Sequence, residues 1–318
     1  MPALSHVAIV GAGLIGCSWA VVFAKAGATV TVFDRDAATL ARVDARVRQT
    51  LADMALYGLA TEPDAIAARI STCATLEQAV AGAEYIQESV FETQEAKHAI
   101  SLQIGAAMDP GAVVGSSSSG IPASAFTKDV PNRDRFLIAH PVNPPHLIPV
   151  VELVPAPWTD PMILPWLRDA MAAAGQAPVV VAREVQGFVL NRLQGALLRE
   201  AWALFDEGYA SAADIDATIS KGLGLRWALM GPFETIDLNA PGGVADYAAR
   251  FGGMYQEIAA SRAGTPERWS EPLAARVTEE RRAALPLENL ADRSRWRDQR
   301  LMQLAAHLSS AEKGGDHD

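Results

Sequence analysis

Three groups of polar side chains in the first half of the chain have types and spacing that suit acid–base chemistry. The serine run Ser116–Ser119 and His140 each follow a run of apolar residues, and Glu152 stands inside one. An ionised carboxylate in an apolar run costs free energy unless a partner pairs with it, and His140 can be that partner. A carboxylate on one ring nitrogen leaves the other free to act as a base. A structural histidine fits the same pattern, so both interpretations stay open on these residues alone.

A second group of residues suits the binding of a dinucleotide. The segment Gly11-Ala-Gly-Leu-Ile-Gly16 fits the pattern G-x-G-x-x-G, follows an apolar run and opens a helical stretch. Asp34 closes the next β-branched run, where an acid can accept hydrogen bonds from both ribose hydroxyls. Because a carboxylate there repels a 2′-phosphate, the pattern favours NAD over NADP, although the neighbouring Arg35 could bind such a phosphate. A glycine turn without a cofactor is the alternative.

These groups need a scaffold that brings the ends of several strands together. Apolar or β-branched runs predict strands at 7–10, 29–33, 85–86, 112–114, 135–138, 150–154 and 179–181. Helical stretches lie between several of these runs, which is typical of a Rossmann-type, mostly parallel α/β sheet.

The second part of the chain has a different pattern. Five residues recur at helical spacing and predict a helix that faces a core: Leu190, Leu193, Leu197, Ala201 and Leu204. Gly208 should end this helix, and Ser211 with Asp214 resembles a capping box that opens the next one. We therefore expect an NAD-binding domain at 1–186 and an all-helical domain at 187–318 that serves substrate binding and dimerisation.

Composition excludes several classes of protein. The formal net charge is −10 and half the residues are hydrophobic, so the chain can bury a core but has no excess of cations for nucleic acid or membrane surfaces. Two cysteines, Cys17 and Cys73, make neither a disulfide framework nor a zinc site. The N-terminal segment has no features of a signal peptide or a membrane span. We expect a soluble cytoplasmic protein with no metal, nucleic-acid or membrane partner.

Ordered motifs over nearly the whole chain resemble the 3-hydroxyacyl-CoA dehydrogenase superfamily. The motifs that carry the resemblance are His140-Pro-Val-Asn-Pro-Pro145, Val151-Glu-Leu-Val154, Gly187-Phe-Val-Leu-Asn-Arg-Leu193 and Gly231-Pro-Phe-Glu234. The serine run, the double proline, and Gly222-Leu-Gly-Leu-Arg226 resemble the lambda-crystallin / L-gulonate 3-dehydrogenase branch. Trp296-Arg-Asp298 extends the likeness toward the end of the chain.

The resemblance implies a role for each matching residue. His140 corresponds to the general base, Glu152 to the carboxylate that orients it, and Ser119 to the hydroxyl that holds the reacting oxygen. Asn191 corresponds to an amide that binds substrate from the helical domain, which would make the site depend on domain closure. The implied cofactor contacts are Gly11, Gly13, Leu14, Ile15, Gly16, Asp34, Glu92, Lys97 and Asn143. From the residues alone, Lys97 is instead a solvated charge on a helix.

The implied reaction is oxidation of the 3-hydroxyl of a small 3-hydroxy acid by NAD. Acyl-CoA members carry a lysine in the segment that here reads Pro145-His-Leu-Ile-Pro149, and they lack an equivalent of Arg226. Arg226 could bind a free carboxylate through two hydrogen bonds, or could form an ordinary surface ion pair. L-gulonate is the first candidate substrate. L-carnitine is the second, with Trp227, Phe233 and Tyr247 available for a quaternary ammonium, and 3-hydroxybutyryl-CoA is the third.

One alternative belongs to another class of protein. Relatives in this branch serve as lens proteins, so the chain could bind NADH with little turnover. The resemblance also implies a homodimer through the helical domain, whose apolar stripes and tryptophans could meet a partner chain.

Overall fold

The computed structural model describes residues 3–262 and 269–314. Contacts divide the described chain into two compact units, which we describe separately. The first unit contains residues up to 193 and those from 294 onward, and the second unit contains residues 194–293. The predicted boundary after residue 186 stays a prediction. In the structure the first segment of this unit ends at Leu193, the fourth residue of a helix that begins at Leu190. The chain rejoins the unit at Ser294.

An eight-stranded sheet forms the centre of the first unit, in the order β3-β2-β1-β4-β5-β6-β7-β8. The strands are β1 His6–Val10, β2 Thr29–Phe33, β3 Ile70–Thr72, β4 Tyr85–Glu88, β5 Val113–Ser116, β6 Phe136–Pro141, β7 Val150–Pro155 and β8 Ala177–Val180. All neighbours pair in parallel except β6 and β7, which are antiparallel. The predicted Rossmann-type fold is confirmed, and β3, a short edge strand, is the strand that the patterns missed.

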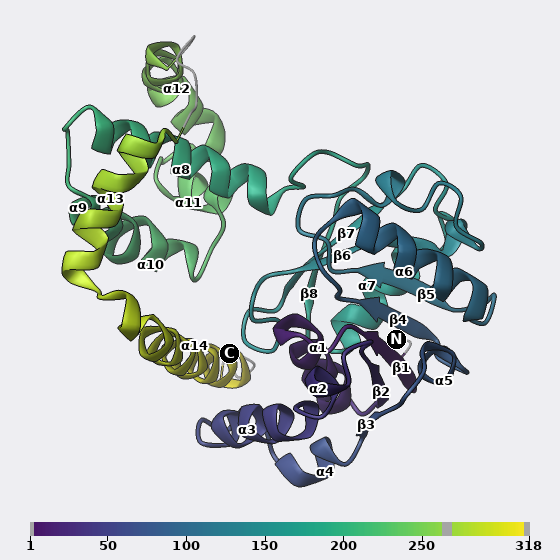
Figure 1. Cartoon of the computed structure of the whole chain (residues 1–318). Coiled ribbons are helices and arrows are strands. Elements are labelled where there is room, and N and C mark those ends of the chain that lie inside the picture. The colour runs from purple at the N-terminus through teal and green to yellow at the C-terminus, as the bar shows by residue number, and fades with distance from the viewer. Residues whose placement is uncertain (1–2, 263–268, 315–318) are drawn as a thin grey trace. The chain divides into compact units, whose positions relative to one another are not determined.

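Helices complete the first unit and form the second (Figure 1). Those before β8 are α1 Leu14–Lys25, α2 Ala37–Leu40, α3 Val43–Ala55, α4 Pro63–Ala67, α5 Leu76–Val80, α6 Gln94–Ala107 and α7 Ile163–Ala173. Those after it are α8 Leu190–Asp206, α9 Ala212–Thr218, α10 Gly224–Trp227, α11 Pro232–Leu238, α12 Gly243–Ser261, α13 Glu271–Ala284 and α14 Leu290–Gly314. Among the described residues after β8 every regular element is helical, as expected for the second part of the chain.

The central strands bury side chains on both faces, because successive residues of a strand point to opposite sides. In β1, Val7 and Ile9 join a cluster with residues of α1, α3 and α7, whereas Ala8 and Val10 join a cluster with residues of α5 and α6. Two covered faces leave the ends of the strands as the place where polar side chains can meet a ligand.

The apolar stripe of α8 is partly buried, since Leu190, Ala201 and Leu204 are half-buried. Leu193 is 61% exposed and Leu197 36% exposed, and among the helix residues Phe205 is the buried one. The predicted stop and cap are confirmed, since Gly208 has φ 73° and the Ser211 hydroxyl accepts a hydrogen bond from the amide of Asp214.

The C-terminal helix contributes to the core of the first unit. Met302 of α14 is buried in the same cluster as the residues of α1. His146 lies close to α1, with its Nδ1 atom 3.1 Å from the Ser18 hydroxyl. Burial lowers the pKa of His146 to about 4, with Asp298 of α14 opposing this shift and Lys25 of α1 adding to it. The imidazole is therefore neutral in the folded chain at neutral pH.

We predict that His146→Gln makes the chain less sensitive to acid. Because the pKa of His146 is lower in the folded than in the unfolded chain, its contribution to stability is complete above about pH 6.5 and is lost as the pH falls toward 4. Between pH 7.5 and pH 5 the loss amounts to about 2 kcal/mol of the free energy of unfolding. Urea unfolding of the wild type, the variant and a His98→Gln control measures it. An equal acid-induced loss in all three proteins would contradict the prediction.

Candidate active site

The predicted site residues of the first unit gather around the carboxyl ends of its central strands. The glycine loop follows β1, Ser116 ends β5, and His140 is the next-to-last residue of β6. Because β1, β4, β5 and β6 run parallel, these ends lie on one edge of the sheet. A ligand bound there would meet residues that are far apart in the sequence.

His140 and Glu152 form a buried pair on neighbouring strands. They stand directly opposite each other in the antiparallel pairing of β6 and β7, with Nδ1 of His140 2.8 Å from Oε2 of Glu152. Both side chains are almost fully buried. With Nδ1 engaged by the carboxylate, the other ring nitrogen, Nε2, is left for a substrate.

The second oxygen of Glu152 is held by the beginning of α8. Oε1 accepts hydrogen bonds from the backbone amides of Val189 and Leu190, at 2.8 and 2.9 Å. Burial acts to raise the pKa of Glu152, but the hydrogen bonds from His140, Leu190 and Val189 outweigh it and hold this pKa below its ordinary value. The carboxylate is therefore ionised at neutral pH, where its charge orients His140 and would stabilise a protonated imidazole.

A tight turn before α8 aims these two amides at Glu152. Gly187 has φ 76° and Phe188 φ 51°, so two successive residues are left-handed, a conformation that costs free energy for a phenylalanine. Phe188 is fully buried, and its ring centroid lies 5.7 Å from that of His140. Sequence reasoning did not single out Phe188. The glycine before it was the only local sign of such a turn.

The structure brings Asn191 and Ser119 together. Nδ2 of Asn191 donates a hydrogen bond of 2.5 Å to the backbone oxygen of Ser119, and the Ser119 side chain is exposed. Because Asn191 directly follows Leu190, a series of hydrogen bonds and adjacent residues connects His140 through Glu152 and α8 to the serine loop. By its contacts Asn191 groups with the first unit, so its place in a separate helical domain stays a prediction.

The glycine loop has the geometry of a phosphate cradle. Gly11 has φ 104°, and a Cβ at Gly16 would lie 1.8 Å from the oxygen of Gly11, so both positions require glycine. At Gly13 a Cβ would meet no atom within 4 Å, which leaves open space at the start of α1. Gly13 caps α1 without a side-chain hydrogen bond, so its first amides can receive an anion.

Asp34 supports this loop from the end of β2. Its Oδ2 accepts a hydrogen bond from the amide of Ala12 at 2.8 Å, and its Oδ1 accepts one from the amide of Asp36 at 2.9 Å. The carboxylate is half-buried beside the loop, where the ribose of a dinucleotide would come. Next to the loop, Leu14 is exposed and Ile15 half-buried.

Lys97 is not a solvated helix charge, which corrects that interpretation. It is 1% exposed, and its Nζ lies 3.2 Å from both oxygens of Glu88 and 3.4 Å from Oε2 of Glu92. Sequence reasoning missed Glu88, the buried last residue of β4. Glu88 follows Gln87 and precedes Ser89, so no apolar run marks it in the sequence.

Two further residues that the sequence predicts for the site, Asn143 and Arg226, are exposed. Asn143 is exposed in the segment after β6. Arg226 lies in the second unit on α10, is exposed, and has no ion pair among the residues that the structure describes. Its guanidinium is therefore available to a ligand.

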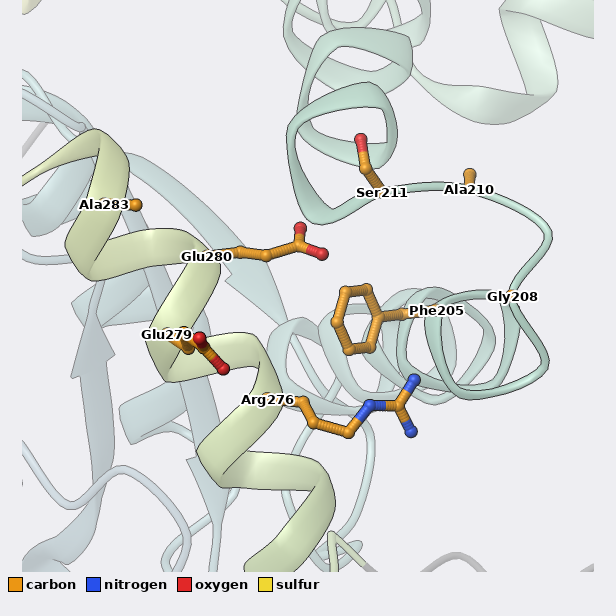
Figure 2. Close-up of a pocket in the computed structure, with 8 residues that line it drawn as sticks. All are labelled: Phe205, Gly208, Ala210, Ser211, Arg276, Glu279, Glu280 and Ala283. Atoms are coloured by element: carbon orange, nitrogen blue, oxygen red, sulfur yellow. The ribbon is translucent and has the colours of Figure 1, made fainter.

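The hollow shown in Figure 2 is lined by none of these residues. It has a volume of about 670 Å³ and is lined within the second unit by Phe205, Gly208, Ala210, Ser211, Arg276, Glu279, Glu280 and Ala283. Two of its charged groups already have partners. Arg276 pairs with Asp206 at 2.8 Å, and Glu280 accepts a hydrogen bond from the amide of Ala212 at 3.0 Å. Nothing in it resembles a set of catalytic groups.

Two kinds of feature are absent from the described part of the chain, a membrane-spanning helix and a cluster of metal-ligating side chains. No helix within residues 3–262 and 269–314 is both long enough and apolar enough to cross a membrane. Over the same residues, no three side chains of the kinds that ligate metals lie together.

Comparison with known proteins assigns the chain to a class and then to a family. Residues 6–185 match the model described as 3-hydroxyacyl-CoA dehydrogenase, NAD binding domain, and residues 187–281 match that of the C-terminal domain. The protein is thus an oxidoreductase that uses NAD. Since these matches cover most of its length, the chain belongs to the 3-hydroxyacyl-CoA dehydrogenase family.

Individual relatives support this assignment. Lambda-crystallin of Oryctolagus cuniculus is 37% identical over 310 residues, 96% of each chain. L-carnitine dehydrogenase of Streptomyces griseus is 40% identical over 252 residues, 78% of this chain and 73% of that protein. Among solved structures, (S)-3-hydroxybutyryl-CoA dehydrogenase from Ralstonia eutropha has a TM-score of 0.65 at 25% identity, covering 81% of this chain and 89% of that one. The resemblance that the motifs indicated is confirmed.

We predict that Phe188→Leu lowers kcat at least about tenfold. The substitution keeps an apolar side chain but removes the ring beside His140 and changes the turn that holds Glu152. Phe126→Leu is the matched control, because Phe126 is buried in the same cluster. Steady-state kinetics and thermal unfolding of both variants separate an effect on the site from loss of stability. Equal kcat values in the two variants would count against the role of Phe188.

Proposed function

We propose that the chain oxidises the 3-hydroxyl of a small 3-hydroxy acid to a 3-keto acid, as an L-gulonate 3-dehydrogenase does. The observation that carries the proposal is the buried His140–Glu152 pair at the edge of the sheet that also bears the glycine loop. Oxidation of an alcohol needs a base for the hydroxyl proton and an acceptor for the hydride. NAD, when bound, supplies the hydride acceptor.

The residues of the site divide the remaining work. His140 takes the hydroxyl proton at Nε2, because Nδ1 is engaged by Glu152. The ionised Glu152 stabilises the imidazolium that forms, and the amides at the start of α8 keep this carboxylate in place. The exposed Ser119 hydroxyl holds the reacting oxygen, and Asn191 binds the substrate beside it.

The cofactor contacts follow from the cradle at the start of α1. Gly11, Gly13, Leu14, Ile15 and Gly16 would hold the pyrophosphate of NAD, for which Gly13 leaves open space. Asp34 accepts hydrogen bonds from the ribose and disfavours the 2′-phosphate of NADP. Glu92, which follows β4, would contact a ribose of the cofactor, and Asn143, which follows β6, would lie beside the nicotinamide.

We assign Arg226 to the free carboxylate of the substrate. Its guanidinium is exposed and has no ion pair in the described part of the chain, and a carboxylate can receive two parallel hydrogen bonds from it. Together with the absence of a lysine from Pro145–Pro149, this favours a free acid over a CoA thioester.

Two other substrates remain alternatives. L-carnitine is favoured by the identity to L-carnitine dehydrogenases and by the exposed rings of Trp227 and Phe233 in the second unit. A 3-hydroxyacyl-CoA is favoured by the family itself. An NADH-binding protein without turnover is the alternative of another class, which the likeness to lambda-crystallins supports.

We also propose that the chain forms a homodimer through its helical part and works in the cytoplasm. The exposed leucines of the α8 stripe, Leu193 and Leu197, support the first proposal because a partner chain would remove them from water.

The substrate assignment is tested by following NADH formation with L-gulonate, L-carnitine and 3-hydroxybutyryl-CoA, each with NAD and NADP. We expect the highest kcat/KM with L-gulonate and NAD. Arg226→Met should lower this value at least about tenfold, mainly through KM, because the carboxylate loses its partner. Arg250→Met, which removes an arginine already paired with Asp246 in the second unit, is the matched control.

Three outcomes would redirect the proposal. A kcat/KM within about threefold of wild type in Arg226→Met would contradict the role of this arginine. A higher value with L-carnitine or with the thioester would replace the substrate. NADH binding without turnover of any compound would favour the binding protein.

A further inference from the structure

The phosphate cradle at the start of α1 contains a peptide that is held by side chains outside the glycine pattern. The carbonyl oxygen of Ala12 accepts a hydrogen bond from the thiol of Cys17 in α1, with Sγ 3.4 Å away. Nη1 of Arg46, the fourth residue of α3, lies 3.5 Å from the same oxygen and 3.9 Å from Sγ of Cys17. Two donors from two helices therefore meet at one backbone oxygen of the loop.

The other side of Ala12 is held as well. Its amide donates to Oδ2 of Asp34 at 2.8 Å, and the residue itself is fully buried. This amide belongs to the peptide that precedes Ala12, whereas the carbonyl oxygen belongs to the peptide that joins Ala12 to Gly13. Asp34 on one side, and Cys17 with Arg46 on the other, thus fix two successive peptides of the loop.

The fixed carbonyl determines where the amide of Gly13 points. In a planar trans peptide the C=O and the following N–H point in opposite directions. Because the oxygen of Ala12 faces Cys17 and Arg46, the N–H of Gly13 faces away from them. This amide has no hydrogen-bond partner among the described residues, and a Cβ at Gly13 would meet no atom within 4 Å. It is an unpaired donor beside open space, which an anion can use.

The chemical states of both side chains suit this role. Burial raises the pKa of the Cys17 thiol against the opposing effect of Arg46, so the thiol keeps its proton and can donate. Arg46 is half-buried and has no ion pair in the described part of the chain, whereas Arg48, two residues later, pairs with Asp44. The positive charge of Arg46 beside the carbonyl also polarises the peptide and strengthens its N–H as a donor.

We propose that Arg46 and Cys17 are positioning residues of the cofactor site, which hold the carbonyl of Ala12 so that the amide of Gly13 points toward the pyrophosphate of NAD. The glycine pattern accounts for the space in this loop, and these two side chains account for the direction of its donor. The proposal concerns the binding of the cofactor alone. It can therefore be tested without any hydroxy acid, whatever the substrate is.

The first experiment compares Arg46→Met with Arg48→Met. We expect the Kd of NADH, from fluorescence titration, to rise at least about fivefold in Arg46→Met, because the charged donor to Ala12 is lost. Arg48→Met removes an exposed, paired arginine of the same helix and should leave this Kd within about twofold of wild type. Thermal unfolding shows whether each variant is folded, and Arg46→Gln replaces Arg46→Met if that variant is not.

Variants of Cys17 separate positioning from a direct contact between Arg46 and the cofactor. A neutral thiol does not attract a phosphate, so we expect it to act through the carbonyl of Ala12. Cys17→Ala should raise the Kd of NADH at least about threefold, and Cys17→Ser, which keeps a donor, should hold it within about twofold of wild type. An unchanged Kd in Cys17→Ala beside a raised Kd in Arg46→Met would make Arg46 a direct contact and overturn the positioning role.

Displacement of NADH by ADP and by adenosine tests whether the effect reaches the phosphates. In Arg46→Met the affinity for ADP should fall by about the same factor as that for NADH. The affinity for adenosine should stay within about twofold of wild type, because adenosine carries no phosphate. Equal losses for ADP and adenosine would indicate a general disturbance of the first unit and overturn the proposal. A Kd of NADH within about twofold of wild type in Arg46→Met would overturn it as well.

Discussion

The site depends above all on one buried carboxylate, that of Glu152. A charge in a sheet that is covered on both faces is unfavourable unless each of its oxygens finds a donor. Here the imidazole of His140 holds one oxygen and two amides at the beginning of α8 hold the other. The same three hydrogen bonds that offset the cost of this charge also orient His140, the proposed base, and anchor the helix that carries Asn191. Stability and chemistry therefore place the same demands on Glu152.

A second network of charged side chains holds the serine loop of the site. Glu88, Lys97 and Glu92 hold the serine loop by its amides, and Asn191 holds it by a carbonyl oxygen. Asn191 is thus the residue at which the two networks meet, because the amide of the preceding residue, Leu190, binds Glu152. The glycine loop completes this edge of the sheet with open space at Gly13, where a phosphate can approach the first amides of α1.

The sequence predicted those features that depend on local pattern. Apolar runs located seven of the eight strands, and an acid within such a run pointed to Glu152 and its histidine. Features that depend on packing between distant segments could not be predicted from the sequence. The direction of Lys97 depends on Glu88, and both residues have side chains whose local pattern suits a solvent-exposed position. The partial exposure of the α8 stripe also depends on how helices pack, which periodicity does not encode.

The central claim is that His140 is the base in a dehydrogenase reaction, and the His140→Ala variant tests it most directly. The measurement is kcat with the best hydroxy acid and NAD, together with the Kd of NADH from fluorescence titration. The account predicts that kcat falls by about a hundredfold or more, the usual contribution of a general base, while the Kd of NADH stays within about threefold of wild type. A variant that keeps most of its activity would contradict the account.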